Sequence, residues 1–137
     1  HRGAAAVVPV REDGKNLMVR QWRNALDRYT FEIPAGGLNG DEPTEDAAAR
    51  ELQEETGYVS EDLSLLITIR TTVAFCNEKI DIYVAQKLKP GHQHLDEDEY
   101  IDVKAFSVED LCEMIYAGQI EDSKTIAAIM SYKNKYC

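Results

Sequence analysis

Three glutamates stand within five residues just before a glycine, in the run Glu51-Leu52-Gln53-Glu54-Glu55-Thr56-Gly57. In an α-helix, residues three and four apart share a face, so these side chains project within an arc of about 100°. Like charges at this spacing destabilise a helix, whereas a divalent cation bound between them makes the arrangement favourable. The spacing predicts an ion site on a helix. A solvated acidic helix face is the alternative interpretation.

The helix that carries these acids is predicted over Thr44–Thr56 from the residues at its two ends. Pro43 and Thr44 begin it, with Thr44 as the expected N-cap, and Gly57 ends it in a left-handed conformation. Arg50 precedes Glu54 by one helical turn and can reach back toward Glu42, so it is expected to orient the acids. The expected inward stripe is Ala48, Ala49, Leu52 and Thr56, whereas Ala47 is expected within the acidic arc.

The wider spacing around the helix follows a known pattern. Gly36 is followed after five residues by Glu42, and after seven more by Arg50-Glu51-Leu52-x-Glu54-Glu55-x-Gly57. This segment resembles the signature box of the Nudix hydrolases, with Tyr58 where that pattern has a bulky aliphatic residue. The resemblance implies metal ligands at Glu51, Glu54 and Glu55 and at the carbonyl of Ala35. The expected ion is Mg²⁺, with Mn²⁺ as a substitute, and Gly36 and Gly37 let the backbone approach it closely.

Composition indicates one compact domain over residues 1–137, since 44% of the residues are hydrophobic. The net charge of −10 argues against a nucleic-acid partner, and no apolar run approaches the length of a membrane span. Cys76, Cys112 and Cys137 are odd in number and widely spaced, which favours reduced thiols in a cytoplasmic protein. The chain starts at His1 without a methionine, so its start is interpreted either as the remnant of an expression tag or as a truncated N-terminal segment.

The order of predicted elements favours an α/β (α+β) fold. Strands are expected at 4–10, 16–22, 29–33, 63–72, 80–86 and 101–106, with a turn at 12–15 and a polar loop at 89–100. Helices are expected at Thr44–Thr56, from Ser107 to Gly118 with Asp110 completing a capping box, and at 122–136. This order suits a mixed sheet between helical layers. The resemblance likewise implies a Nudix α/β/α sandwich, a central mixed β-sheet flanked by helices.

Outside the box, the chain is similar to the ADP-ribose pyrophosphatase branch of the family. The similarity lies in Val19-Arg20-Gln21-Trp22-Arg23, Phe31-Glu32-Ile33-Pro34-Ala35-Gly36, Asn77-Glu78-Lys79-Ile80, residues 96–101, and Asp122-Ser123-Lys124-Thr125-Ile126. It implies hydrolysis of the pyrophosphate bond of a nucleoside diphosphate linked to X, with ADP-ribose giving AMP and ribose 5-phosphate, and it implies a homodimer. The branch carries a proline-containing run where this chain has Val73 and Ala74. Another nucleotide sugar or a dinucleotide as substrate therefore stays open, as does a non-catalytic nucleotide sensor.

Further site candidates come from the same resemblance. A general base is expected before the 101–106 strand, with Glu99 as first choice and Glu97 as second; the alternative is a plain acidic loop. Arg20 and Arg23 are expected to bind phosphate or to form surface ion pairs, and Glu32 is expected to assist at the nucleotide end.

Three remaining features have simpler interpretations beside the functional ones. Trp22 either stacks on a base or belongs to the core. His92 and His94 suggest zinc but lack a third close ligand, so a plain loop is favoured. Asp122 and Lys124 are expected to cap and anchor the last helix.

Overall fold

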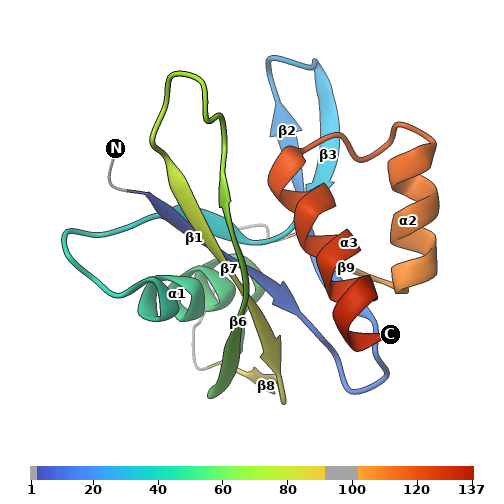
Figure 1. The fold of residues 1–137 in the computed structure, drawn as a ribbon. Helices are drawn as coiled ribbons and strands as arrows, with labels where there is room; N and C mark the ends of the chain where they lie inside the picture. The colour runs from blue at the N-terminus through green and yellow to red at the C-terminus, as the bar shows by residue number, and fades with distance from the viewer. Residues whose placement is uncertain (1–2, 92–101) are drawn as a thin grey trace.

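The computed structural model of the protein describes residues 3–91 and 102–137 (Figure 1). The two candidate bases, Glu97 and Glu99, lie outside the described residues, as do His92, His94 and Ile101. The elements follow in the order β1 (Ala4–Pro9), β2 (Asn16–Arg23), β3 (Arg28–Glu32), β4 (Ala35–Gly37), α1 (Thr44–Thr56), β5 (Tyr58–Val59), β6 (Asp62–Arg70), β7 (Lys79–Gln86), β8 (Lys89–Pro90), β9 (Val103–Phe106), α2 (Val108–Tyr116) and α3 (Ser123–Tyr136).

A four-stranded mixed sheet forms the centre of the fold, with strand order β4-β1-β7-β6. β1 pairs in parallel with β7, and the other two pairings are antiparallel. Ala5 and Val7 pack with α1 through Leu52, whereas the alternate residues Ala6 and Val8 belong to the larger core that α2 and α3 cover. The sheet is thus covered on both faces, with α1 and α3 on opposite sides (Figure 1). The predicted mixed sheet between helical layers is confirmed.

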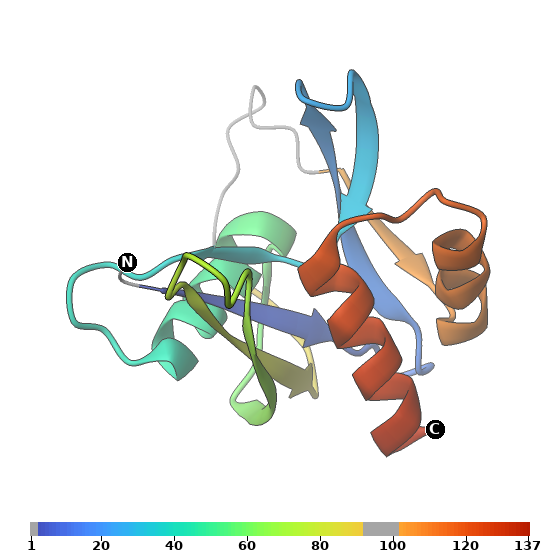
Figure 2. The same cartoon turned by 45° about the horizontal axis from the view of Figure 1, so that its top comes forward.

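A second sheet is antiparallel, with strand order β3-β2-β9, and lies beside α2 and α3 (Figure 2). β2 pairs with β3 from Val19 opposite Glu32 to Arg23 opposite Arg28. The chain passes from β3 directly into β4, so this sheet delivers Glu32 to the edge of the central sheet. β5 and β8 form a separate two-residue pairing.

The three helices confirm the predicted positions, with corrections in detail at the start of α1. The N-cap of α1 is Pro43, which makes no side-chain cap bond, and the prediction that Thr44 is the N-cap is wrong. The Thr44 hydroxyl instead donates to Asp81 at 2.8 Å, because the first turn rests against β7. Ala47 is fully buried against the sheet, so its placement among the acids is also wrong. Ala49 is only partly buried.

Three short strands, β4, β5 and β8, have no counterpart in the sequence prediction. The predicted polar loop from residue 89 begins with β8, where Val59 pairs with Lys89 and Tyr58 with Pro90. The predicted strand over 63–72 ends at Arg70. The turn at 12–15 is confirmed, and Gly14 adopts a φ of 85° there. No helix among residues 3–91 and 102–137 is long and apolar enough to cross a bilayer.

Candidate active site

The acids of α1 occupy different environments. Glu51 is 8% exposed, Glu55 is partly buried, and the side chain of Glu54 is 52% exposed. The helix ends where predicted, at Gly57 with a φ of 78° and its N–H bonded to the carbonyl of Gln53. Glu51 and Glu55 therefore face the protein, whereas Glu54 lies at the rim.

Gly36 lies directly against Glu51. A Cβ atom at position 36 would fall 2.1 Å from Oε1 of Glu51, far inside van der Waals contact. The close approach at this glycine is made to a carboxylate of the box, and the expected approach to an ion stays a prediction. At Gly37 the same added atom would meet nothing within 4 Å of it.

Arg50 joins the loop to the acids. Its Nη2 donates to Glu42 at 2.6 Å and to the carbonyl of Gly37 at 3.1 Å, while Nη1 donates to Glu51 at 2.8 Å and lies 3.5 Å from Glu54. The hydrogen bond to Glu42 raises the pKa of Arg50, and the same bond lowers that of Glu42. The predicted contacts with Glu42 and Glu54 are confirmed.

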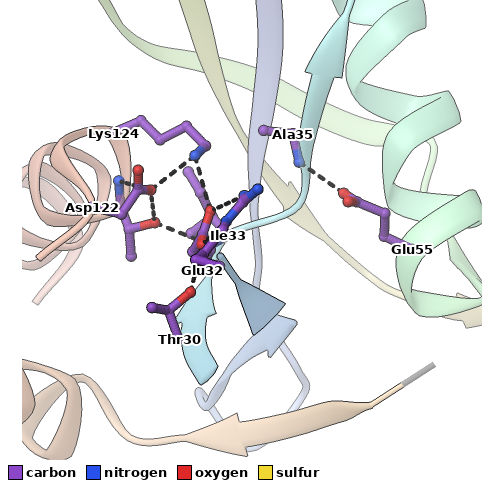
Figure 3. Close-up of polar contacts among 9 residues, drawn as sticks. Thr30, Glu32, Ile33, Ala35, Glu55, Asp122 and Lys124 are labelled. Carbon is purple, nitrogen blue, oxygen red and sulfur yellow. Dashed lines mark hydrogen bonds and ion pairs between the residues drawn. The ribbon is translucent and has the colours of Figure 1, made fainter. Parts of the chain in front are cut away.

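Glu55 points from α1 toward β4, where its Oε2 accepts a hydrogen bond from the N–H of Ala35 at 2.8 Å (Figure 3). Burial raises the pKa of Glu55 to about 7, and the neighbouring charge of Glu51 adds to the shift. Burial also raises the pKa of Glu51. Two partly desolvated carboxylates one helical turn apart are poorly compensated by protein groups alone.

The donor set suits a hard divalent cation, because it consists of carboxylate oxygens beside a loop that glycine keeps open. In the described part of the chain, however, no three His, Cys, Asp or Glu side chains are gathered as metal ligands. Glu51 and Glu54 both pair with Arg50, whereas Glu55 accepts the hydrogen bond from Ala35. The ligand role of these residues stays a prediction.

Glu32 is the centre of a second cluster, with its side chain 3% exposed. Arg23 donates to both of its oxygens, from Nε at 2.7 Å and Nη2 at 2.6 Å. Thr30 donates at 2.6 Å and Lys124 at 3.2 Å (Figure 3). Burial alone would raise the pKa of Glu32, but the hydrogen bonds from Arg23 and Thr30 and the charge of Lys124 lower it to about 2.

The start of α3 completes this cluster. Asp122 is the N-cap residue and accepts from the N–H of Thr125 at 3.2 Å and from its hydroxyl at 2.6 Å. Lys124 also donates to Asp122, at 2.9 Å. The Thr125 hydroxyl lies 3.2 Å from the N–H of Ile33, which ties α3 to the end of β3. The predicted capping by Asp122 is confirmed.

One cleft of about 580 Å³ joins both groups of residues. The described residues that line it include six predicted site residues: Arg23, Glu32, Ala35, Gly36, Gly37 and Glu55. Glu55 lines it from the helix side, and Ser123 and Lys124 line it from α3. Arg20, Arg50, Glu51 and Glu54 are not among the lining residues.

Arg20 and Trp22 lie on the exposed part of β2. Arg20 donates to Asp102 at 2.9 Å, so the surface ion pair considered for Arg20 is present. Its Cζ also lies 3.7 Å from the centroid of the Tyr29 ring. Trp22 is 47% exposed and packs edge-on against Tyr29. The expectation of Trp22 in the core is wrong, because its strand extends beyond the layer that α2 and α3 cover. Cys76, Cys112 and Cys137 are all free.

Lys124 is a lining residue that the sequence did not identify as part of the site. Its partner Glu32 is 92 residues away in the chain, so no local spacing could reveal their contact. The available signals were its place in the similar stretch from Asp122 to Ile126 and its neighbour Asp122, which was interpreted as the cap of the last helix.

Comparisons with known proteins agree with the geometry. A family model described as the NUDIX domain matches residues 1–129. The chain is 38% identical over 131 residues to an ADP-ribose pyrophosphatase of Bacillus subtilis, and 40% identical over 131 residues to a methanol dehydrogenase activator of Bacillus methanolicus. Each alignment covers 94% of this chain and 71% of the relative.

The fold is similar to a crystal structure of an ADP compounds hydrolase, with a TM-score of 0.85 at 23% identity, covering 96% of this chain and 71% of that one. The family model matches most of the chain, the signature box is present, and two Bacillus proteins are 38% and 40% identical to it. The chain therefore belongs to the Nudix family of hydrolases.

Proposed function

We propose that the protein is a magnesium-dependent pyrophosphatase that hydrolyses ADP-ribose or another ADP-sugar to AMP and a sugar phosphate. The observation that carries this proposal is that Glu55, Gly36, Arg23 and Lys124 all line one cleft of about 580 Å³. Carboxylates suit a metal ion and paired cations suit phosphate oxygens, so the cleft has a donor set for each part of a metal-bound diphosphate. The name of the relative from Bacillus subtilis supports ADP-ribose as the substrate.

The residues that would hold the ion are Glu51, Glu54, Glu55 and the carbonyl of Ala35, with Mn²⁺ as an expected substitute. A bound ion would neutralise charge on the diphosphate and lower the pKa of the attacking water. Arg50 would keep Glu51 in place through its bonds to Glu42 and Gly37. Arg23 would bind a phosphate oxygen, and Glu99 or Glu97 would accept the proton of the water.

A substrate panel tests the proposal directly. ADP-ribose, GDP-mannose and a dinucleoside polyphosphate are each incubated with Mg²⁺, with Mn²⁺ and with EDTA, and the products are separated by chromatography. AMP and ribose 5-phosphate formed only with a metal ion would support it. Preference for another substrate would favour the alternative suggested by Val73 and Ala74, which lie in an exposed loop beside the cleft residues Thr71 and Glu78. Binding without turnover of any compound would favour a sensor.

The Glu55→Gln variant provides the matched test of the acidic helix. We expect its turnover to fall by at least about a thousandfold, because a neutral amide is a much weaker ligand for a hard cation than a carboxylate. Gln retains an oxygen that can accept the hydrogen bond from Ala35, so circular dichroism and the melting temperature should stay close to wild type. Turnover like that of the wild type in Glu55→Gln would contradict the proposed role.

Two further proposals concern the whole protein. We infer that the protein is a homodimer, which the family resemblance supports. We also infer a cytoplasmic location, which the three free cysteines support. Sedimentation equilibrium of the purified chain measures the first, and fractionation of the source cells measures the second.

A further inference from the structure

Lys124 reaches the cleft from α3, whereas Glu55 reaches it from α1 (Figure 3). The Lys124 side chain is 18% exposed, and its Nζ lies 2.9 Å from Asp122 and 3.2 Å from Glu32. An ammonium group has three N–H donors. Among the described residues two of them are used, so one remains for a ligand in the cleft.

Arg23 holds the other side of the same carboxylate. Its Nε and Nη2 both donate to Glu32, and no hydrogen bond from Nη1 is found in the described part of the chain. The Arg23 side chain is 44% exposed and lines the cleft. One buried carboxylate thus binds two cations that both line the cleft and that each keep a donor unused among the described residues.

The charge balance of the cleft makes these two cations important to an anion. The described lining residues include four carboxylates, Glu32, Glu55, Glu78 and Asp122, but only Arg23 and Lys124 as cations. An anionic group that enters the cleft is repelled over much of its surface. Among the described lining residues, charge-assisted hydrogen bonds from cations are available to it beside Arg23 and Lys124.

Burial of the Glu32 carboxylate beside Lys124, whose side chain is 18% exposed, also has an energetic cost. A buried ion pair costs desolvation energy and is commonly no more stabilising than well-packed apolar side chains. The cluster is therefore poorly explained as a device for stability. It is better explained as a support that keeps the ends of two long, flexible side chains in fixed positions.

We propose that Lys124 is a substrate-binding residue that holds a pyrophosphate oxygen together with Arg23, and that Glu32 is a positioning residue for both cations. This inference rests on the proposed function for the identity of the substrate. It gives Glu32 a role other than direct contact with the nucleotide, since its oxygens already accept four hydrogen bonds from Arg23, Thr30 and Lys124.

The first test compares Lys124→Met with Lys133→Met, which removes the same charge from an exposed position on the same helix. We expect the KM for ADP-ribose to rise about tenfold in Lys124→Met with kcat within threefold of wild type, because the lost contact exists before and during the reaction. Lys124→Arg should recover part of the loss, and Lys133→Met should behave as wild type. A KM within twofold of wild type in Lys124→Met overturns the proposal.

Glu32→Gln tests the positioning role. Like Lys124→Met, it should raise the KM for ADP-ribose. The double variant Glu32→Gln/Lys124→Met should raise this KM by less than the product of the two single effects, since Glu32 acts partly through Lys124. Strictly multiplicative effects would show that Glu32 does not position Lys124.

A binding experiment separates this inference from the proposed function. Calorimetry measures inorganic pyrophosphate with Mg²⁺, and adenosine as the ligand without phosphate, on the wild type and on Lys124→Met. Pyrophosphate affinity should fall about tenfold with adenosine unchanged. Failure of the wild type to hydrolyse ADP-ribose would overturn the proposed function alone. Equal pyrophosphate affinity of the two proteins, or no binding to the wild type, would overturn the role of Lys124.

Discussion

Gly36 and Gly37 are adjacent in the loop, yet only Gly36 is tightly constrained by a side chain. An alanine at position 36 would place its Cβ 2.1 Å from the Glu51 carboxylate, whereas one at position 37 would meet no atom within 4 Å. The carboxylate is the end of a flexible side chain and can move aside. The expected consequence is a displaced acid in a folded protein.

We therefore predict that Gly36→Ala lowers kcat/KM about a hundredfold and leaves the melting temperature within a few degrees of wild type, since a displacement of about 1 Å can cost that much activity. Steady-state kinetics and thermal melting measure the two effects. Gly37→Ala, the matched change, should retain most of the activity. A similar loss in both variants would show that loop flexibility, rather than contact with Glu51, is what matters.

At the residue scale, the sequence predicted the acidic group because helical spacing is a local property. It predicted the contact of Arg50 with Glu54 for the same reason. It could not predict that Glu54 lies at the rim while Glu51 is buried, since that depends on how α1 sits on the sheet. The bond between Glu55 and the N–H of Ala35 likewise joins two segments whose relative placement only the tertiary fold defines.

At the scale of elements, α2 and α3 both begin with a side chain that caps the helix, but the two caps have different surroundings. Ser107 caps α2 and accepts from the N–H of Asp110 at 3.1 Å, while Asp122 caps α3 and also binds Lys124. Loss of a side-chain cap commonly costs about 0.5–2 kcal/mol. The two caps therefore have similar structural value, but only one of them adjoins the cleft.

We predict that Ser107→Ala and Asp122→Ala each lower the free energy of unfolding by about 1 kcal/mol. Only Asp122→Ala should raise the KM for ADP-ribose, by severalfold, because Lys124 keeps a single partner in that variant. Urea unfolding and steady-state kinetics give the two measurements. An equal rise of KM in Ser107→Ala would mean that general loosening of the helices, rather than Lys124, controls binding.

The element predictions succeeded where a signal lies within the element. The helix boundaries follow from Gly57, Ser107 and Asp122, each of which acts on its own helix. β4, β5 and β8 contain two or three residues each, too few to show a period of two. They exist because a neighbouring strand offers free backbone groups, as β1 does for β4.

At the scale of the whole molecule, Glu32 joins parts of the chain that are distant in sequence, namely β2 through Arg23 and α3 through Lys124. Its pKa of about 2 in the folded state lies below the ordinary value of 4.5. The folded state therefore holds the Glu32 proton less tightly than the unfolded chain does. This linkage stabilises the fold above about pH 4.5, and the stabilisation is lost as the pH falls from there toward 2.

We predict that the free energy of unfolding falls by roughly 2–3 kcal/mol through this group between pH 5 and pH 2. Glu32→Gln should be less stable than wild type at neutral pH, and the difference should shrink as the solution is acidified. Chemical unfolding at a series of pH values measures both curves. Glu121→Gln, which removes an exposed carboxylate near the same helix, is the control and should run parallel to wild type. A constant difference between Glu32→Gln and wild type at all pH values would contradict the linkage.

The fold class could be predicted from the sequence, but the pairing of the strands could not. The order of elements predicted a mixed sheet between helices, which the structure confirms. The order β4-β1-β7-β6 and the separate sheet of β3, β2 and β9 depend on which strands meet across long stretches of chain. No short pattern in one sequence carries that information.

The parallel pairing of β1 with β7 has a consequence for biosynthesis. Ala4 is opposite Ile80, so the central pair of strands cannot form until some seventy-five further residues have left the ribosome. At about 5–20 residues per second, the nascent chain spends several seconds with its most apolar strand uncovered. A translational pause placed before codon 79 should therefore lengthen the interval in which chaperones and proteases can reach β1.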